Sequence, residues 1–123
     1  MTGIEWVIDA AGCSSRSLSD LESARILFDE IIRELKLHPI GETQWHQFPE
    51  TGGITALCLL TESHVAFHTF PEHGSMCLNI FCCASRTEWN FEGVFQRIFE
   101  AKSVTVRQLS RIFVHPHAMA AKH

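Results

Sequence analysis

Apolar residues recur along this chain with two periods, one typical of helices and one typical of strands. The helical period of about 3.6 residues is clearest from Leu21 to about Lys36. Just before it, Ser19-Asp20-Leu21-Glu22 matches a capping box with serine at the N-cap. A second helical pattern runs from about Thr87 to Ala101. We therefore predict two helices, each with one apolar face.

Alternation of apolar and polar residues marks the segments that we predict to be strands. One of them, 54 to 61, is mostly apolar and is predicted to lie inside a sheet. In another, Val65 and Phe67 share one face, while His64 and His68 share the other. The predicted strands are 4 to 10, 43 to 48, 54 to 61, 64 to 70, 76 to 82 and 103 to 114.

The predicted order β-α-β-β-β-β-α-β decides the fold class. It offers few of the long crossovers that parallel pairing needs, so the sheet should be largely antiparallel. Both helices should then pack on one face. The sequence predicts a single domain over residues 1–123, of the α+β class, built as a two-layer α/β sandwich.

Composition narrows the function classes. The formal net charge is -4 and the pI about 6.0, which argues against a nucleic-acid partner. No apolar run approaches the roughly 20 residues of a membrane span, and the first residues do not resemble a signal peptide. The five cysteines are odd in number, and Cys82 and Cys83 are adjacent. We expect a reduced, cytoplasmic protein in which Cys13 and Cys58 are packing residues.

Reactive side chains crowd residues 59 to 84, which hold three histidines and three cysteines. Burying such groups without partners is costly, so their density indicates a site. A metal at His64, His68 and Glu72 would suit helical spacing. On a strand, however, four residues span about 13 Å, which is too far for one ion. We therefore predict no metal.

Two other readings stay open at this point. One is a hydrolase in which Ser63 or Cys83 is the nucleophile and a histidine is the base. Ser63 lacks the GxSxG elbow, although a Cys–His pair depends on the fold and stays possible. The other reading is structural, with Ser63 in a turn and the histidines satisfied in a half-buried sheet.

The order of the reactive residues favours a third reading. The segment ESHVAFHTFPE, residues 62 to 72, is followed by NIFCC at residues 79 to 83. Together they resemble the ESHxxxHTxPE and DxFTCG segments of the prokaryotic, pyruvoyl-dependent S-adenosylmethionine decarboxylase proenzymes. The resemblance covers most of residues 4 to 113.

This resemblance implies self-cleavage between Glu62 and Ser63. Residues 1–62 would become the beta chain and 63–123 the alpha chain. Ser63 would be converted to a pyruvoyl group, the cofactor, which forms a Schiff base with the substrate amine and acts as an electron sink. The implied function is decarboxylation of S-adenosylmethionine to supply the aminopropyl donor for spermidine.

The resemblance also implies roles for single residues. His68 matches the proton acceptor in processing, and Cys83 matches the catalytic proton donor. Thr55 stands where a serine usually supports processing, and its hydroxyl is expected to preserve that role. Family active sites lie between two protomers, which implies a homodimer.

Substrate contacts are carried over from the family as further predictions. Glu72 would bind the ribose hydroxyls, and Phe48 or Trp6 would stack on adenine. The family pattern is only partly kept near the proton donor, where Asn79, Cys82 and Ala84 replace aspartate, threonine and glycine. These departures leave open a pyruvoyl decarboxylase of arginine or ornithine. An uncleaved, non-catalytic paralogue is a separate alternative, and the intact Glu62-Ser63-His64, His68 and Cys83 argue against it.

Overall fold

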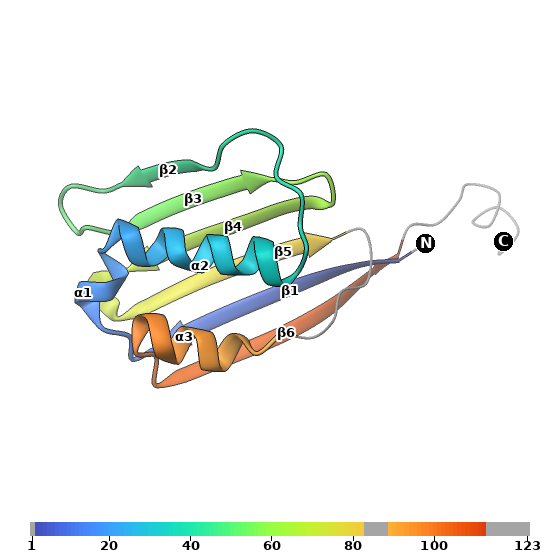
Figure 1. Cartoon of the computed structure of the whole chain (residues 1–123). Coiled ribbons are helices and arrows are strands. Elements are labelled where there is room, and N and C mark those ends of the chain that lie inside the picture. The colour runs from blue at the N-terminus through green and yellow to red at the C-terminus, as the bar shows by residue number, and fades with distance from the viewer. Residues whose placement is uncertain (1, 83–88, 113–123) are drawn as a thin grey trace, which may run out of the picture.

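The strands that the structure describes form one six-stranded sheet (Figure 1). A computed structural model describes residues 2–82 and 89–112. The strands lie in the order β2-β3-β4-β5-β1-β6, and every neighbouring pair is antiparallel. The strands are β1 (Thr2–Ala11), β2 (Gln44–Gln47), β3 (Ile54–Leu59), β4 (Ser63–Phe70), β5 (Ser75–Cys82) and β6 (Ser103–Ile112).

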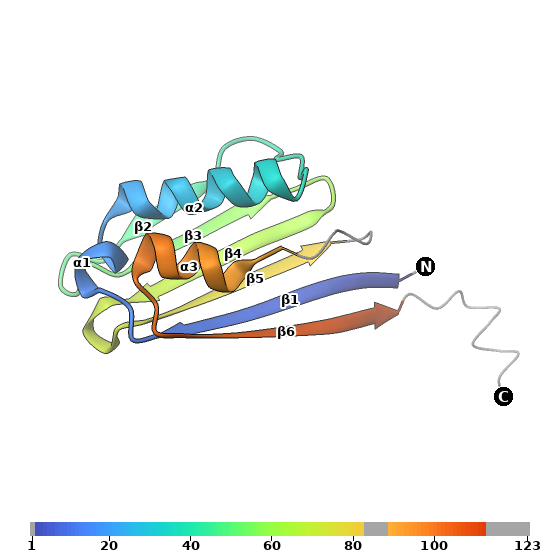
Figure 2. The same cartoon turned by 60° about the horizontal axis from the view of Figure 1, so that its bottom comes forward.

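The helices cover one face of this sheet, as Figure 2 shows. They are α1 (Ser15–Leu18), α2 (Leu21–Glu34) and α3 (Phe91–Phe99), with a short 3-10 turn η1 (Pro71–His73) between β4 and β5. In the described part of the chain no helix lies on the other face, which we call the open face. The predicted two-layer α+β sandwich is thus confirmed. None of the described helices is long and apolar enough to span a bilayer.

Strand alternation builds the core between the sheet and the helices. On β4, every second residue from Val65 is buried, as the sequence pattern predicted. Phe67 packs edge-on to Phe28 of α2, with ring centroids 5.6 Å apart, and contacts Phe99 of α3 at 6.2 Å. Cys13 and Cys58 are buried, in agreement with their predicted packing role.

Thr69 is a polar residue inside this apolar layer, and both bonding capacities of its hydroxyl are used. The hydroxyl donates to the carbonyl oxygen of Leu18 (2.8 Å) and accepts from the N–H of Ile54 (2.9 Å). A buried hydroxyl without partners would be destabilising. Thr69 therefore joins α1, β3 and β4 at one end of the sheet.

The start of the long helix differs from the prediction. Asp20, not Ser19, is the N-cap of α2, and its carboxylate accepts from the N–H of Glu22 (3.2 Å). Ser19 instead closes the unpredicted helix α1, because its hydroxyl donates to the carbonyl oxygen of Ser15 (2.6 Å). The serine that resembled an N-cap therefore belongs to the preceding turn.

The second long helix is shorter than predicted. It begins at Phe91 behind Asn90, whose side chain accepts from the N–H of Gly93 (3.0 Å). It ends at Phe99 because Glu100 adopts a left-handed conformation. The predicted start at Thr87 and the predicted strand end at 113–114 lie outside the described residues.

Candidate active site

Three rows of side chains cross the open face of the sheet, and the third row holds two of the predicted site residues, His68 and Thr55. Because strands alternate, His64, Ala66 and His68 all point to this face. The first row holds Leu59, His64, Phe81, Glu5 and Leu109; the middle row holds Leu57, Ala66, Asn79, Val7 and Arg107; the third row holds Thr55, His68, Cys77, Asp9 and Thr105.

Ser63 lies just beyond the first row, where the chain turns from β3 into β4. Its φ angle is 154°, in a region that residues other than glycine rarely adopt. The N–H of Leu60 donates to the carbonyl oxygen of Ser63 (2.9 Å), which closes a tight turn. The strain thus falls on the residue that follows the predicted scissile bond, and such strain costs about 1–3 kcal/mol.

Glu62, on the other side of that bond, is tied to the connection between α2 and β2. Its carboxylate accepts from the N–H of His38 (3.0 Å) and lies 2.5 Å from Nδ1 of the same residue. Burial alone raises the pKa of Glu62, but the hydrogen bonds from His38 outweigh it and lower the pKa to about 2. Glu62 is therefore ionised and held in place at neutral pH.

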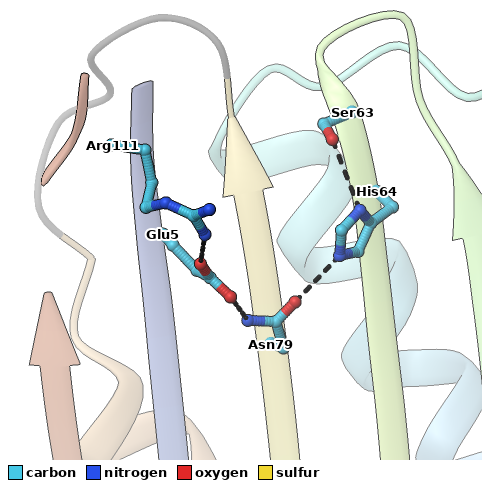
Figure 3. A network of polar contacts seen from close by, with 5 residues as sticks. All are labelled: Glu5, Ser63, His64, Asn79 and Arg111. Atoms are coloured by element: carbon cyan, nitrogen blue, oxygen red, sulfur yellow. Dashed lines mark hydrogen bonds and ion pairs between the residues drawn. The ribbon is translucent and has the colours of Figure 1, made fainter. Parts of the chain in front are cut away.

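A chain of polar contacts runs across the open face from Ser63 (Figure 3). We call it the open-face network, and its members come from β1, β4, β5 and β6. Its contacts are Ser63 Oγ to His64 Nδ1 (3.3 Å), His64 Nε2 to Asn79 Oδ1 (2.9 Å), Asn79 Nδ2 to Glu5 Oε2 (2.6 Å) and Arg111 to Glu5 Oε1 (2.6 Å).

The ring of Phe81 lies over this network. It stacks on the imidazole of His64, with centroids 6.0 Å apart and planes 11° from parallel, and the guanidinium of Arg111 lies 5.5 Å from its centroid. The hydrogen bond from Asn79 lowers the pKa of Glu5, burial opposes this effect, and Arg111 adds to it, so that the pKa stays below its ordinary value. The network therefore holds an ionised carboxylate.

His68 and Thr55 form a second polar group, in the third row. Thr55 Oγ1 lies 2.5 Å from His68 Nδ1. The rings of Phe70 and Phe48 lie 4.4 Å and 6.1 Å from the His68 ring. His68 is five residues from Ser63 on the same strand, a separation of about 16 Å along β4. The structure thus does not bring His68 to Ser63 within one chain.

Between the two polar groups the open face is hollowed. The hollow has a volume of about 420 Å³, and its wall includes Leu57, Ala66, His68 and Asn79. Its size is within the range of small-molecule sites. The small side chain of Ala66 leaves room at the centre of the sheet.

The remaining predicted residues are distributed unevenly. Phe48 is exposed beside His68, and Glu72 is exposed in η1, at the far end of β4 from Ser63. Trp6 is only 3% exposed and packs against Phe91 under the helices, so its ring is not available for stacking on a ligand. We correct that candidate accordingly.

Of the two adjacent cysteines at the end of β5, the structure describes Cys82 but not Cys83. Cys83, the predicted proton donor, lies outside the described residues. Cys82 is buried on the helix-covered face and is paired in register with Ser63, so the last residue of β5 is beside the predicted cleavage site.

Sequence reasoning assigned no role to His64, Glu5, Arg111 or His38, and it treated Asn79 only as a departure from the family pattern. One signal was present, because Glu5 stands between Ile4 and Trp6 in an apolar strand. A metal was not predicted, and among the described residues no group of three or more histidine, cysteine, aspartate or glutamate side chains could hold one.

Comparison with known proteins gives the family of the chain. The family described as S-adenosylmethionine decarboxylase matches residues 4–112. An S-adenosylmethionine decarboxylase proenzyme of Picrophilus torridus is 30% identical over 112 residues, which cover 89% of this chain and 83% of that protein. Another, of Caldanaerobacter subterraneus subsp. tengcongensis, is 26% identical over 123 residues, covering 96% and 95%.

A solved structure supports the fold. The crystal structure of the adenosylmethionine decarboxylase from Aquifex aeolicus VF5 superposes with a TM-score of 0.77 and 23% identity, and covers 93% of each chain. Matches of this extent place the protein in the decarboxylases, a class of lyases. The chain belongs to the S-adenosylmethionine decarboxylase family, which confirms the resemblance found in its sequence.

Proposed function

We propose that this chain cleaves itself between Glu62 and Ser63 and then decarboxylates S-adenosylmethionine through a pyruvoyl group made from Ser63. The observation that carries the proposal is the strained backbone of Ser63, whose hydroxyl lies beside a histidine nitrogen. Membership of a family whose relatives are named proenzymes supports it. The place of action that we propose is the cytoplasm.

Cleavage uses groups of this chain. The Ser63 hydroxyl loses its proton and Oγ bonds to the carbonyl carbon of Glu62. The peptide C–N bond then breaks, the Ser63 nitrogen takes up a proton, and an ester replaces the amide. Removal of the Ser63 Cα proton next expels the Glu62 carboxylate. Addition of water to the resulting dehydroalanine, with loss of ammonia, leaves the pyruvoyl group.

The surroundings of Ser63 fit this chemistry. Strain at Ser63 is relieved when the peptide bond breaks, which favours the forward direction. The side chain of Glu62 stays bonded to His38, so the new C-terminus at Glu62 remains in place after the bond to Ser63 breaks. Once formed, the pyruvoyl group supplies a carbonyl that binds the substrate amine and accepts electrons from the breaking bond. We keep Cys83 as the proton donor and Phe48 and Glu72 as substrate contacts.

We further propose that the active enzyme is a homodimer joined at its open faces. His68, Thr55, Phe48 and Glu72 lie toward one end of β4, and Ser63 lies at the other. A two-fold partner placed across the open face would bring the His68 end of one protomer to the Ser63 end of the other. Exposed apolar residues on this face support such a contact: Leu57 (48% exposed), Leu59 (56%) and Leu109 (48%).

The proposal is tested by the intact mass of the purified protein. We expect two fragments, residues 1–62 and a second fragment that begins with a pyruvoyl group. Ser63→Ala is expected to leave one full-length chain. Cys83→Ala is expected to be cleaved normally but to release no carbon dioxide from S-adenosylmethionine.

Each part of the proposal has a contrary outcome. A single unmodified wild-type chain would refute self-processing, and cleavage of Ser63→Ala would refute the assigned nucleophile. Unchanged turnover in Cys83→Ala would remove that residue from its role. Carbon dioxide release from arginine or ornithine, without release from S-adenosylmethionine, would replace the substrate and leave the cofactor in place.

A further inference from the structure

The open-face network joins Ser63 to groups on three other strands. The mechanism proposed above assigns no step to its other members, which are His64, Asn79, Glu5 and Arg111. We propose that this network fixes the tautomer of His64, so that its Nδ1 accepts the hydroxyl proton of Ser63 during self-cleavage. The inference rests on the proposed self-cleavage and adds its base and its positioning residues.

The direction of the hydrogen bonds follows from the outer end of the network. The guanidinium of Arg111 can only donate, and the ionised carboxylate of Glu5 can only accept. Oε1 of Glu5 accepts from Arg111 at 2.6 Å, and Oε2 accepts from Nδ2 of Asn79 at 2.6 Å. The amide orientation of Asn79 is thereby fixed, because its oxygen could not face a carboxylate.

The same reasoning fixes the proton on His64. With its nitrogen turned to Glu5, Asn79 presents Oδ1 to Nε2 of His64 at 2.9 Å. An amide oxygen only accepts, so Nε2 must carry the proton. In a neutral ring Nδ1 is then a bare acceptor, and the atom it faces is Ser63 Oγ at 3.3 Å. The hydroxyl of Ser63 therefore donates to His64.

Phe81 holds the ring in the plane that this geometry needs. Its ring is nearly parallel to the imidazole, at 11°. A stack of this kind restricts rotation of the His64 ring, and the hydrogen bond to Asn79 fixes which nitrogen points inward. His64 thus has both its orientation and its tautomer set before reaction.

In the first step of cleavage the proton of Ser63 Oγ passes to Nδ1 of His64 while Oγ bonds to the Glu62 carbonyl carbon. The imidazolium keeps its Nε2–H on Asn79, and the charge of Glu5 stabilises it through the network. When the C–N bond breaks, Nδ1 returns the proton to the Ser63 nitrogen. Processing must also remove the Cα proton of Ser63, and that step is left for His68.

The network also accounts for the departure from the family pattern at position 79. An aspartate there could not donate to Glu5, and two carboxylates would face each other at hydrogen-bonding distance. An asparagine donates to Glu5 and accepts from His64 at the same time. The residue pair Glu5 and Asn79 is therefore matched.

Three variants test the inference by the rate at which newly made chains are cleaved, followed by intact mass. Asn79→Asp should slow cleavage about 10- to 100-fold, since it removes a hydrogen bond to a charged group. Glu5→Gln should slow it less, because the new amide oxygen still accepts from Asn79. Glu5→Gln combined with Asn79→Asp should restore the rate to near wild type, because the amide at position 5 then donates to the carboxylate at position 79.

A spectroscopic measurement separates positioning from a merely structural role. In Ser63→Ala, which stays uncleaved, the ¹⁵N chemical shifts of His64 should show protonated Nε2 and bare Nδ1. Ser63→Ala with Asn79→Leu should lose this pattern, because leucine offers no acceptor to Nε2 of His64, while thermal unfolding reports whether each variant is folded.

The outcomes are distinct from those of the proposed function. A wild-type chain that is never cleaved refutes the function itself. Wild-type cleavage with an unaffected Asn79→Asp variant refutes the inference alone, as does a proton on Nδ1 in Ser63→Ala. A slowed Asn79→Asp variant that Glu5→Gln does not rescue also overturns it, because the matched pair is then without effect.

Discussion

At the scale of single residues, the most informative feature is the backbone of Ser63. A φ of 154° places a residue with a side chain where glycine is normally required. The strain is local, because Ser63 pairs regularly with Cys82 on β5. An unfavourable conformation that persists in an otherwise regular strand indicates a function that needs it.

This strain predicts an unusual order of stability for two uncleaved variants. Ser63→Gly should have a larger free energy of unfolding than Ser63→Ala, by about 1–2 kcal/mol, since glycine adopts this φ without strain. Urea denaturation of both single chains measures the difference. Glycine in a strand is normally the less stable of the two, so the ordinary order would contradict a strained Ser63.

At the scale of elements, the turn between β3 and β4 is fastened to the connection after α2. The carbonyl oxygen of His38 accepts from the N–H of Thr61 (2.9 Å), and the side chain of Glu62 accepts from His38. Pro39 also forms an isolated bridge with Leu60. The turn that holds the predicted scissile bond is therefore braced from outside the hairpin.

The contact between Glu62 and His38 should stabilise the fold in a pH-dependent way. The pKa of Glu62 is lowered from 4.5 to about 2 in the folded chain. The stabilisation from this contact is therefore complete above pH 4.5 and is lost as the pH falls towards 2. In the Ser63→Ala background, Glu62→Gln should lower the free energy of unfolding at pH 6 more than at pH 3. Urea denaturation at the two pH values tests this.

The matched control is Glu50→Gln, at an exposed position in the turn between β2 and β3. It should change stability equally at both pH values. An equal effect of Glu62→Gln at pH 6 and pH 3 would mean that the contact with His38 does not stabilise the fold.

Alternation was enough to predict most elements and the faces of β4, because burial on one side of a strand repeats every second residue. Element ends depended on contacts that a local pattern does not contain. Ser19 has the sequence position of an N-cap, but its hydroxyl donates to the carbonyl oxygen of Ser15 in the preceding helix.

Sequence reasoning proposed the candidate site residues mainly from the segment that carries the family resemblance. Glu62, Ser63 and His68 stand in one segment, and their family resemblance was visible. Glu5 and Arg111 are each more than 40 residues away from these three residues in the sequence, and they meet because β1 lies between β5 and β6. Strand order brings these residues together, whereas the periodicity of a strand specifies only the face on which each residue lies.

At the scale of the whole molecule, the two polar groups of the open face lie about 16 Å apart along β4. One holds Ser63, and the other holds His68 with Thr55. A homodimer across the open face would combine the two groups from different protomers. Two variants that each lack one of these groups should therefore complement each other when they are made together.

Ser63→Ala and His68→Ala are each expected to remain uncleaved when made alone. When they are made together, His68→Ala chains should be cleaved, because a Ser63→Ala partner supplies His68. Intact mass measures the cleaved share, which should grow with the proportion of Ser63→Ala chains. The control partner, Ser63→Ala combined with His68→Ala, should give no cleavage, and an uncleaved first mixture would place His68 outside the shared site.

The strand order has one more consequence for a chain cut after Glu62. The first fragment would contribute β1, β2 and β3, and the second would contribute β4, β5 and β6. In the sheet, β1 lies between β5 and β6, so each fragment is interleaved with the other. The pieces could not separate without opening the sheet. Before the cut, folding is unimolecular; afterwards, recovery from denaturation would require two molecules to meet and would depend on their concentration. Such a protein would refold readily as the uncut proenzyme but only slowly, at low concentration, as the cleaved enzyme.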